Sequence, residues 1–267
     1  MDFAMLIGVG LLTGVTTVLF GFGGGFVAVP VVVWTDAALG ADAMRVATAT
    51  SALVMVLNAG FATAVTPRRV LLSLRGSGML LLLLAAGASA GALATRLAPA
   101  ALAHWAFVAY VALTIIDLVL RPGFLRPSNH AAAAPGAPRP LPPALGAPIG
   151  AVAAFLGVGG SVMTVPAMRR AGHPMSVATA LANPLTLAIA LPATAVSLYV
   201  AAVPAATHAQ VRLVGLIDVR AASALLLGAL PVIAVLRRRP PRIPDRVHAW
   251  AYVGLLLMVT VAMLDLV

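Results

Sequence analysis

The sequence contains no cysteine, no lysine and no glutamate. The absence of cysteine excludes disulfides, a thiol nucleophile and cysteine-ligated metals. Charged residues make up only 9% of the chain, whereas a soluble domain carries about 25%. Hydrophobic residues make up 62%, and the mean hydropathy is +1.07. Because so much apolar surface could not face water, the composition predicts an all-α, polytopic integral membrane protein.

The net charge of +10 comes from 17 arginines set against 7 aspartates. In a soluble protein such an excess would suggest nucleic acid as a partner. In a membrane protein, arginines in short loops set the orientation of the helices, so we expect no nucleic-acid partner. The expected partners are the lipid bilayer and a small solute, and apolar helix faces leave a homo-oligomer open. No basic region follows Met1, so the first apolar segment is expected to stay in the mature protein.

The chain contains one glycine-rich block twice. Residues 14–30 read GVTTVLFGFGGGFVAVP and residues 150–166 read GAVAAFLGVGGSVMTVP, with six identities at a constant offset of 136. A second repeat follows each copy, since the Val-Ala-Thr-Ala run at 46–49 returns at 177–180. Glycine accounts for 24 of 267 residues, so chance does not explain the match. Two glycine-broken apolar segments, one in each half, are typical of a transporter's central site.

Apolar segments occur along the whole chain, near residues 3–20, 26–35, 46–65, 77–97, 104–120, 145–156, 162–168, 178–203, 218–236 and 247–266. A crossing helix needs about 20 residues, so segments 26–35 and 162–168 are too short. Each is interpreted as the second arm of a helix broken at the glycines. The predicted halves are residues 1–120 and 145–267, joined by a mobile, proline- and alanine-rich linker at 121–144.

Arginine positions separate two topologies. Eight plain transmembrane helices would put nine arginines on one side and eight on the other, which is no bias. If each broken segment instead re-enters and leaves on its own side, each half has three crossings. Thirteen arginines then lie on one side of the membrane and four on the other. That division fits the positive-inside rule. We therefore predict two inverted repeats, each with a re-entrant helix pair plus three transmembrane helices, and both termini outside.

The glycine blocks predict an anion site. Irregular backbone survives at membrane depth only where protein or a wet cavity covers it. The short helix that restarts after each block presents unpaired N–H groups and a partial positive charge at its N-terminus, which suits an anion. Inverted copies would bring two such ends together near the midplane. Neither repeat core contains an acidic residue, so we expect no metal and no cofactor.

The candidate substrate-binding residues are the glycine blocks and the polar residues that follow them. The backbone candidates are Gly21, Gly23, Gly24, Gly25, Gly157, Gly159 and Gly160, together with Ser161. The side-chain candidates are Thr48, Thr50, Ser51, Thr179 and Asn183. Two alternatives stand beside this interpretation: glycines can serve close helix packing alone, as we expect for Gly87 and Gly91, and hydroxyls can bond their own helix backbone.

Ionisable residues within the apolar segments are few. Asp218 precedes an apolar run and is predicted to be a helix N-cap rather than a proton carrier. Four histidines fall at segment edges, where a solvated position is expected: His104, His173, His208 and His248. A serine hydrolase would need a base at the depth of Ser161, and a metalloprotease would need a histidine pair with an acid. Neither pattern is present, so the chain is not expected to be an enzyme.

The duplicated G-x6-G-x-GG-x5-P block, the Ala-Thr-Ala run after it and the proline-rich central loop resemble the sulfite exporter TauE/SafE family of membrane permeases. The resemblance covers nearly the whole chain. It implies a multi-pass carrier of the bacterial inner membrane that moves sulfite, sulfoacetate, thiosulfate or related small anions. Residues 48–51 match the family's Thr/Ser run, whereas the second half has Ala-Leu-Ala-Asn-Pro at 180–184 where members often keep Thr-Ser.

The predicted function is secondary transport, as an exporter, of a small anion such as sulfite or an organosulfonate. The anion would bind between the two broken-helix N-termini, and alternating access would move the halves around this site. The alternative is a passive anion channel of the same architecture, because channels also place helix ends at the midplane.

Overall fold

The computed structural model describes residues 2–125, 140–199 and 213–265. Within these ranges, seven helices are long and apolar enough to cross a membrane. They are α1 (Phe3–Phe20), α3 (Ala43–Ala64), α5 (Gly78–Leu97), α6 (Ala100–Leu120), α10 (Met175–Tyr199), α11 (Val219–Arg238) and α12 (Asp245–Leu264). Two two-residue strands, β1 (Leu213–Val214) and β2 (Ile217–Asp218), pair antiparallel. The prediction of an all-α, polytopic membrane protein is confirmed.

Two shorter helices follow the glycine blocks. α2 (Gly25–Thr35) follows α1 after a bend at residues 21–24, and α9 (Ser161–Arg170) follows α8 (Gly146–Leu156) after a bend at 157–160. α1, with 18 residues, is itself long enough to cross a membrane, whereas α8 has 11 residues. Short helical turns complete the connections: η1 (Ala37–Asp42), α4 (Arg68–Leu71), η2 (Leu72–Leu74) and η3 (Pro143–Leu145).

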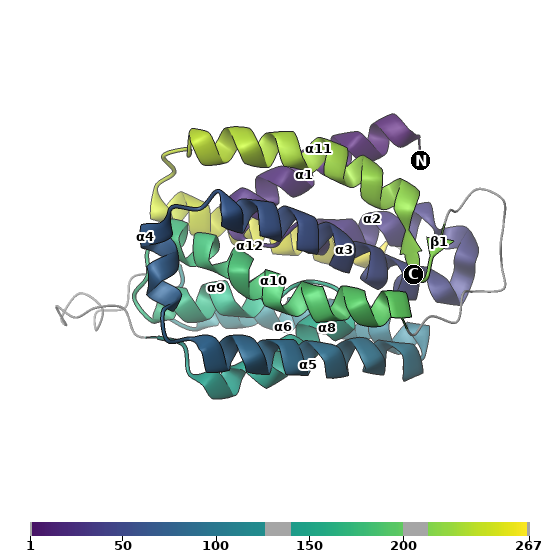
Figure 1. The fold of residues 1–267 in the computed structure, drawn as a ribbon, viewed down its shortest axis with the longest axis horizontal. Coiled ribbons are helices and arrows are strands. Elements are labelled where there is room, and N and C mark those ends of the chain that lie inside the picture. The colour runs from purple at the N-terminus through teal and green to yellow at the C-terminus, as the bar shows by residue number, and fades with distance from the viewer. Residues whose placement is uncertain (1, 126–139, 200–212, 266–267) are drawn as a thin grey trace.

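Most of the helices run along the long axis of the molecule, so the bundle has two ends (Figure 1). The N-terminus, the C-terminus and β1 lie at one end, which we call the strand end, and α4 lies at the other, the α4 end (Figure 1). At the strand end, the Arg45 guanidinium at the start of α3 donates to the carbonyl of Ala98, which follows α5, at 3.2 Å. At the α4 end, Arg169 of α9 pairs with Asp245 of α12 at 2.5 Å.

The two broken helices run in opposite directions. Near its start α1 packs against Leu225, close to the beginning of α11 at the strand end, and α2 returns to Asp36 at that same end. α8 begins at the α4 end, where Gly146 packs against Leu80 at the start of α5, and α9 returns there to Arg170. The first hairpin therefore opens toward the strand end and the second toward the α4 end.

The arginines are concentrated at one end. Eleven of the fourteen described arginines lie at the α4 end: Arg68, Arg69, Arg75, Arg121, Arg169, Arg170, Arg237, Arg238, Arg239, Arg242 and Arg246. The other three, Arg45, Arg96 and Arg220, lie at the strand end. This asymmetry is the kind that the positive-inside rule associates with a cytoplasmic face.

The halves interlock through two close helix pairs. α1 packs in parallel on α11, and α8 packs in parallel on α5. A Cβ added to Gly87 or Gly91 would lie 2.1 Å from the carbonyl oxygen of Ala147 or Ala151, and one added to Gly228 would lie 2.2 Å from that of Ile7. Small residues therefore let the paired backbones approach closely, and the packing role expected for Gly87 and Gly91 is confirmed.

The predicted linker lies largely outside the described residues, which stop at 125 and resume at 140. Its first residues nevertheless pack on the bundle, contrary to the expectation of mobility for the whole segment. Phe124 is fully buried, and its ring lies 5.4 Å from that of Tyr252, centroid to centroid. The apolar Phe-Leu pair at 124–125 explains this difference, since burial removes these side chains from water.

Candidate functional site

Each glycine block makes a sharp bend that needs glycine. In the first bend Gly21, Gly23 and Gly24 all have positive φ, between 62° and 86°. In the second, Gly157 and Gly159 have φ of 71°, whereas Gly160 has φ of −78°. Residues with a Cβ rarely adopt positive φ, so five of these six positions favour glycine for conformational reasons. At Gly160 the limit is space, because an added Cβ would lie 2.6 Å from Ile189 Cδ1.

The two bends meet at the centre of the bundle. A Cβ added to Gly23 would lie 3.0 Å from Thr186 Cγ2 and 3.2 Å from Met55 Cγ. A Cβ added to Gly159 would lie 2.9 Å from Met55 Sδ and 3.0 Å from Thr186 Cγ2. The same two side chains therefore contact both bends, and they come from α3 and α10, the corresponding helices of the two halves.

Unpartnered polar groups gather beside the helix starts that follow the bends. The first-turn N–H groups of α2 and α9 have no acceptor within their own helices, although the Met163 N–H in α9 donates to the carbonyl of Gly160 at 3.1 Å. Both amide atoms of Asn58 are buried without a hydrogen-bond partner among the described residues, and Nδ2 lies 2.8 Å from a Cβ added to Gly24. The Ser161 hydroxyl, on the first residue of α9, is buried and likewise unpartnered there. Such groups are costly to bury unless something binds them.

Four of the predicted side chains lie at the bends or close to them. Ser51 donates across the halves to the carbonyl of Gly157 at 2.9 Å. Asn183 donates, in long contacts, to Thr17 at 3.4 Å and to Thr179 at 3.3 Å. The hydroxyls of Thr48 and Thr179 donate to their own helix backbone, although Thr48 Cγ2 lies 3.0 Å from a Cβ added to Gly157. In this conformation the hydrogen bonds and contacts of these four side chains hold the backbone at and next to the bends in place.

The structure does not bring Thr50 to the bends. Its hydroxyl accepts the backbone N–H of Asp218 at 2.9 Å, so it faces β2 and the strand end. Thr50 is two residues from Thr48, about 200° around the helix, so the two side chains point to different faces of α3.

Two carboxyls are buried next to this contact. Asp218 Oδ1 accepts the N–H groups of Arg220 at 2.8 Å and Ala221 at 3.1 Å, which confirms its predicted role as the N-cap of α11. Asp36, in the connection after α2, is 4% exposed. Burial, reinforced by the nearby charge of Asp218, raises the pKa of Asp36 to about 7. Burial also raises the pKa of Asp218. Both residues lie outside the long apolar helices.

An aromatic cluster packs against the bends. Phe22, in the first bend, lies 5.1 Å from Tyr252 and 5.9 Å from Phe20, centroid to centroid. Phe124 lies 5.4 Å from Tyr252, centroid to centroid, and the Tyr252 hydroxyl donates to the carbonyl of Ser161 at 3.1 Å. These rings are all buried. The second bend is therefore tied to the same aromatic cluster as the first.

The structure corrects the expectation that His248 is exposed to solvent. It was predicted to be solvated at a segment edge, but it is 6% exposed and its Nε2 lies 2.5 Å from the carbonyl oxygen of Leu19. The last carbonyls of a helix have no intrahelical partner, so the ring supplies one for α1 just before the first bend. His208 lies outside the described residues.

Sequence reasoning missed Met55, Asn58 and Thr186 as members of the site. A signal was available, since Thr48, Ser51, Met55 and Asn58 follow the i, i+3, i+7, i+10 spacing of one helix face. The 131-residue offset between the Val-Ala-Thr-Ala runs also relates Met55 to Thr186 and Asn58 to Ile189. An amide in an apolar segment is itself a functional signal.

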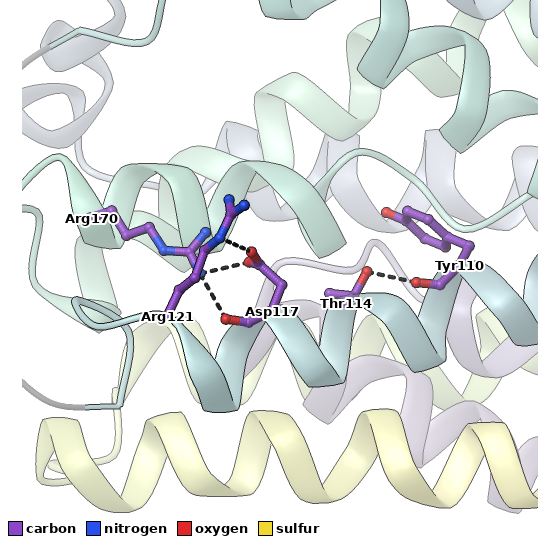
Figure 2. Close-up of polar contacts among 5 residues, drawn as sticks. All are labelled: Tyr110, Thr114, Asp117, Arg121 and Arg170. Atoms are coloured by element: carbon purple, nitrogen blue, oxygen red, sulfur yellow. Dashed lines mark hydrogen bonds and ion pairs between the residues drawn. The ribbon is translucent and has the colours of Figure 1, made fainter.

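Ion pairs tie the end of α9 to its neighbours at the α4 end. Figure 2 shows Asp117 of α6 between two arginines, with Oδ2 at 2.6 Å from Arg170 Nη2 and Oδ1 at 3.1 Å from Arg121 Nε. Arg170 also donates to the carbonyl of Asp117 at 3.2 Å. Basic groups at a helix C-terminus interact favourably with the helix dipole. The hairpin that carries the second bend is therefore anchored at its open end.

A family model described as Sulfite exporter TauE/SafE matches residues 6–263. Comparisons with curated proteins and with solved structures give no significant match. The family match covers both bends and all seven long helices apart from their outermost residues.

Proposed function

Since the chain belongs to the sulfite exporter TauE/SafE family, which implies a membrane transporter of sulfite or a related anion, we propose that it is a secondary transporter that exports sulfite or an organosulfonate. We place it in a bacterial inner membrane with the α4 end toward the cytoplasm. The arginine asymmetry between the two ends supports that orientation, and the opposed directions of the two hairpins support an inverted-repeat carrier.

The proposed substrate site lies where the two bends meet. Backbone N–H groups at the starts of α2 and α9, the Asn58 amide and the Ser161 hydroxyl would bind the oxyanion. The observation that carries this proposal is the set of buried, unpartnered polar groups beside the α2 and α9 N-termini. The site is unequal in its halves, because Asn58 adjoins Gly24 whereas Ile189 adjoins Gly160. The first bend is therefore the more polar binding surface.

A carrier explains the closed centre better than a channel does. The bends are buried, and the aromatic cluster packs against them. A channel needs a continuous path in its conducting state, whereas a carrier alternates between states that open to one side. Sulfite-stimulated proton movement under a pH gradient would support the carrier, and sulfite flux without any such movement would support the channel alternative.

The decisive experiment measures sulfite flux in vesicles that contain the purified protein. Gly24→Val adds a side chain at φ of +86°, 2.8 Å from Asn58 Nδ2, and Gly160→Val adds one 2.6 Å from Ile189. Both variants should insert normally and lose transport. Gly8→Val is the matched control, because nothing lies within 4 Å of a Cβ at this exposed position in α1. Wild-type flux in both bend variants would contradict the proposed site, and no sulfite flux in the wild type would contradict the function.

A further inference from the structure

A narrow cavity enters the bundle at the strand end, between α3, α5, α8 and α10. Its polar lining residues are Arg45, Thr48, Thr95, Arg96 and Ser197, and its volume is about 20 Å³. A cavity of roughly 10–15 Å³ holds one water molecule, so in this conformation the cavity has room for about one water molecule. The lining contains no aspartate.

The cavity leads toward the second bend. Thr48 lines it and lies 3.0 Å from a Cβ added to Gly157. Thr95 also lines it, and its hydroxyl donates at 3.0 Å to the carbonyl of Phe155, in the last turn of α8 before that bend. The inner wall of the cavity therefore includes one residue that adjoins the bend, Thr48, and one that contacts the helical turn before it, Thr95.

Two guanidinium groups stand at the outer part of this cavity. Arg45 pairs with Asp42 and donates to the carbonyls of Arg96 and Ala98, each at 3.2 Å, and its Nε is buried without a partner among the described residues. Arg96 donates to the carbonyl of Val196 at the end of α10. The third described arginine at this end, Arg220, is exposed and does not line the cavity.

Guanidinium groups in a narrow, low-dielectric passage attract anions and raise their local concentration. Their planar fork also matches the oxygens of an oxyanion. We propose that Arg45 and Arg96 form an outer anion-binding subsite, through which a sulfur oxyanion passes between the strand end and the glycine bends. This subsite rests on the proposed transport function, and it assigns to these two residues the selection of negatively charged solutes.

The first test uses Arg45→Gln, Arg96→Gln and the control Arg220→Gln in vesicles that expose the strand end. Each of the first two variants should raise the sulfite concentration for half-maximal flux about tenfold, which corresponds to about 1.4 kcal/mol, with a maximal rate within about twofold of wild type. Arg96→Lys should restore most of the affinity, because it keeps the charge. An unchanged half-maximal concentration in both variants, or an equal rise in Arg220→Gln, would overturn the subsite.

The second test does not depend on transport. Because the chain has no cysteine, Ser197→Cys places a single thiol in the cavity lining. An anionic methanethiosulfonate reagent should modify this thiol several-fold faster than a cationic one, and adding Arg45→Gln or Arg96→Gln should abolish the difference. Equal rates for the two reagents with both arginines present would contradict the subsite, even if sulfite transport is observed. A wild-type protein that carries no sulfite but keeps the anionic preference would contradict only the transport function.

Discussion

Met55 of α3 and Thr186 of α10 each contact both glycine bends, at positions that the 131-residue repeat offset relates to each other. The corresponding places in the two halves therefore hold a flexible thioether and a hydroxyl. Met55 also packs against Gly25: a Cβ added to Gly25 would lie 2.4 Å from Met55 Sδ and 2.7 Å from Met55 Cγ. Methionine side chains adapt readily to a changing space, so this position is suited to the anion binding proposed between the bends.

Substitution of Asn58 should separate an effect on transport from an effect on the stability of the fold. Its two amide atoms are buried without partners among the described residues, and each such group costs about 1–3 kcal/mol. Asn58→Leu should therefore abolish sulfite flux without lowering the thermal midpoint of the purified protein. Asn183→Leu is the comparison, since Asn183 donates two hydrogen bonds and its loss should lower the midpoint. Wild-type flux in Asn58→Leu would remove Asn58 from the site.

The helix pair α5 and α8 should tolerate no side chain at its closest approach. A Cβ on Gly91 would lie 2.1 Å from the carbonyl oxygen of Ala151, so Gly91→Ala must push the helices apart, at a cost of about 1–3 kcal/mol. Thermal unfolding in detergent should show a lower midpoint. Gly254→Ala in α12 has no atom within 4 Å of the new Cβ and should raise the midpoint slightly, because alanine favours helix. A stable Gly91→Ala variant would contradict the described packing.

Asp36 should make stability depend on pH in a defined window. The pKa of its carboxyl rises from the ordinary 3.8 to about 7 in the folded protein, mainly because the group is buried. Between these values the folded state binds more protons than the unfolded state, so stability falls as pH rises from about 4 to about 7 and then levels off. Thermal midpoints at several pH values should show this fall, and Asp36→Asn should reduce it. Asp2→Asn, at an exposed aspartate, should leave the fall unchanged, and an equal slope in Asp36→Asn would contradict the assignment.

The ion pairs of Asp117 should differ in strength. The side chain of Arg170 is 28% exposed and that of Arg121 is 75% exposed. Exposed pairs contribute about 0–1 kcal/mol, so a double-mutant cycle with Asp117→Asn should give a larger coupling energy for Arg170→Gln than for Arg121→Gln. Equal coupling energies for the two arginines would contradict the expected difference between the more buried pair and the more exposed pair.

The sequence predicted the bends well, because only glycine readily supplies the positive φ that Gly21, Gly23 and Gly157 adopt. It also predicted the long helices, because their lengths follow from uninterrupted apolar runs. It did not predict which face of α3 meets the bends. Thr50 was included because it lies near Thr48 in sequence, and Asn58 was omitted although it shares a face with Ser51. The proposed roles of these residues in substrate binding stay predictions.

The helix partners were also beyond sequence reasoning. Glycines spaced by four indicate a close neighbour, but they do not name it, and the partner of Gly87 and Gly91 turned out to be α8 of the other half. The burial of His248 depends in the same way on a distant segment, because its acceptor is the carbonyl of Leu19 near the opposite end of the chain.

The pairing of α1 with α11 has a consequence for biosynthesis. When α1 leaves the ribosome, the helix that covers its glycine face is still about 200 residues from being translated, as the positions of Gly10 and Gly228 show. Until then the insertion machinery or lipid must hold α1, and the nascent first half cannot complete its own interior. Two fragments cut at the central segment should therefore mature only when a cell makes both together.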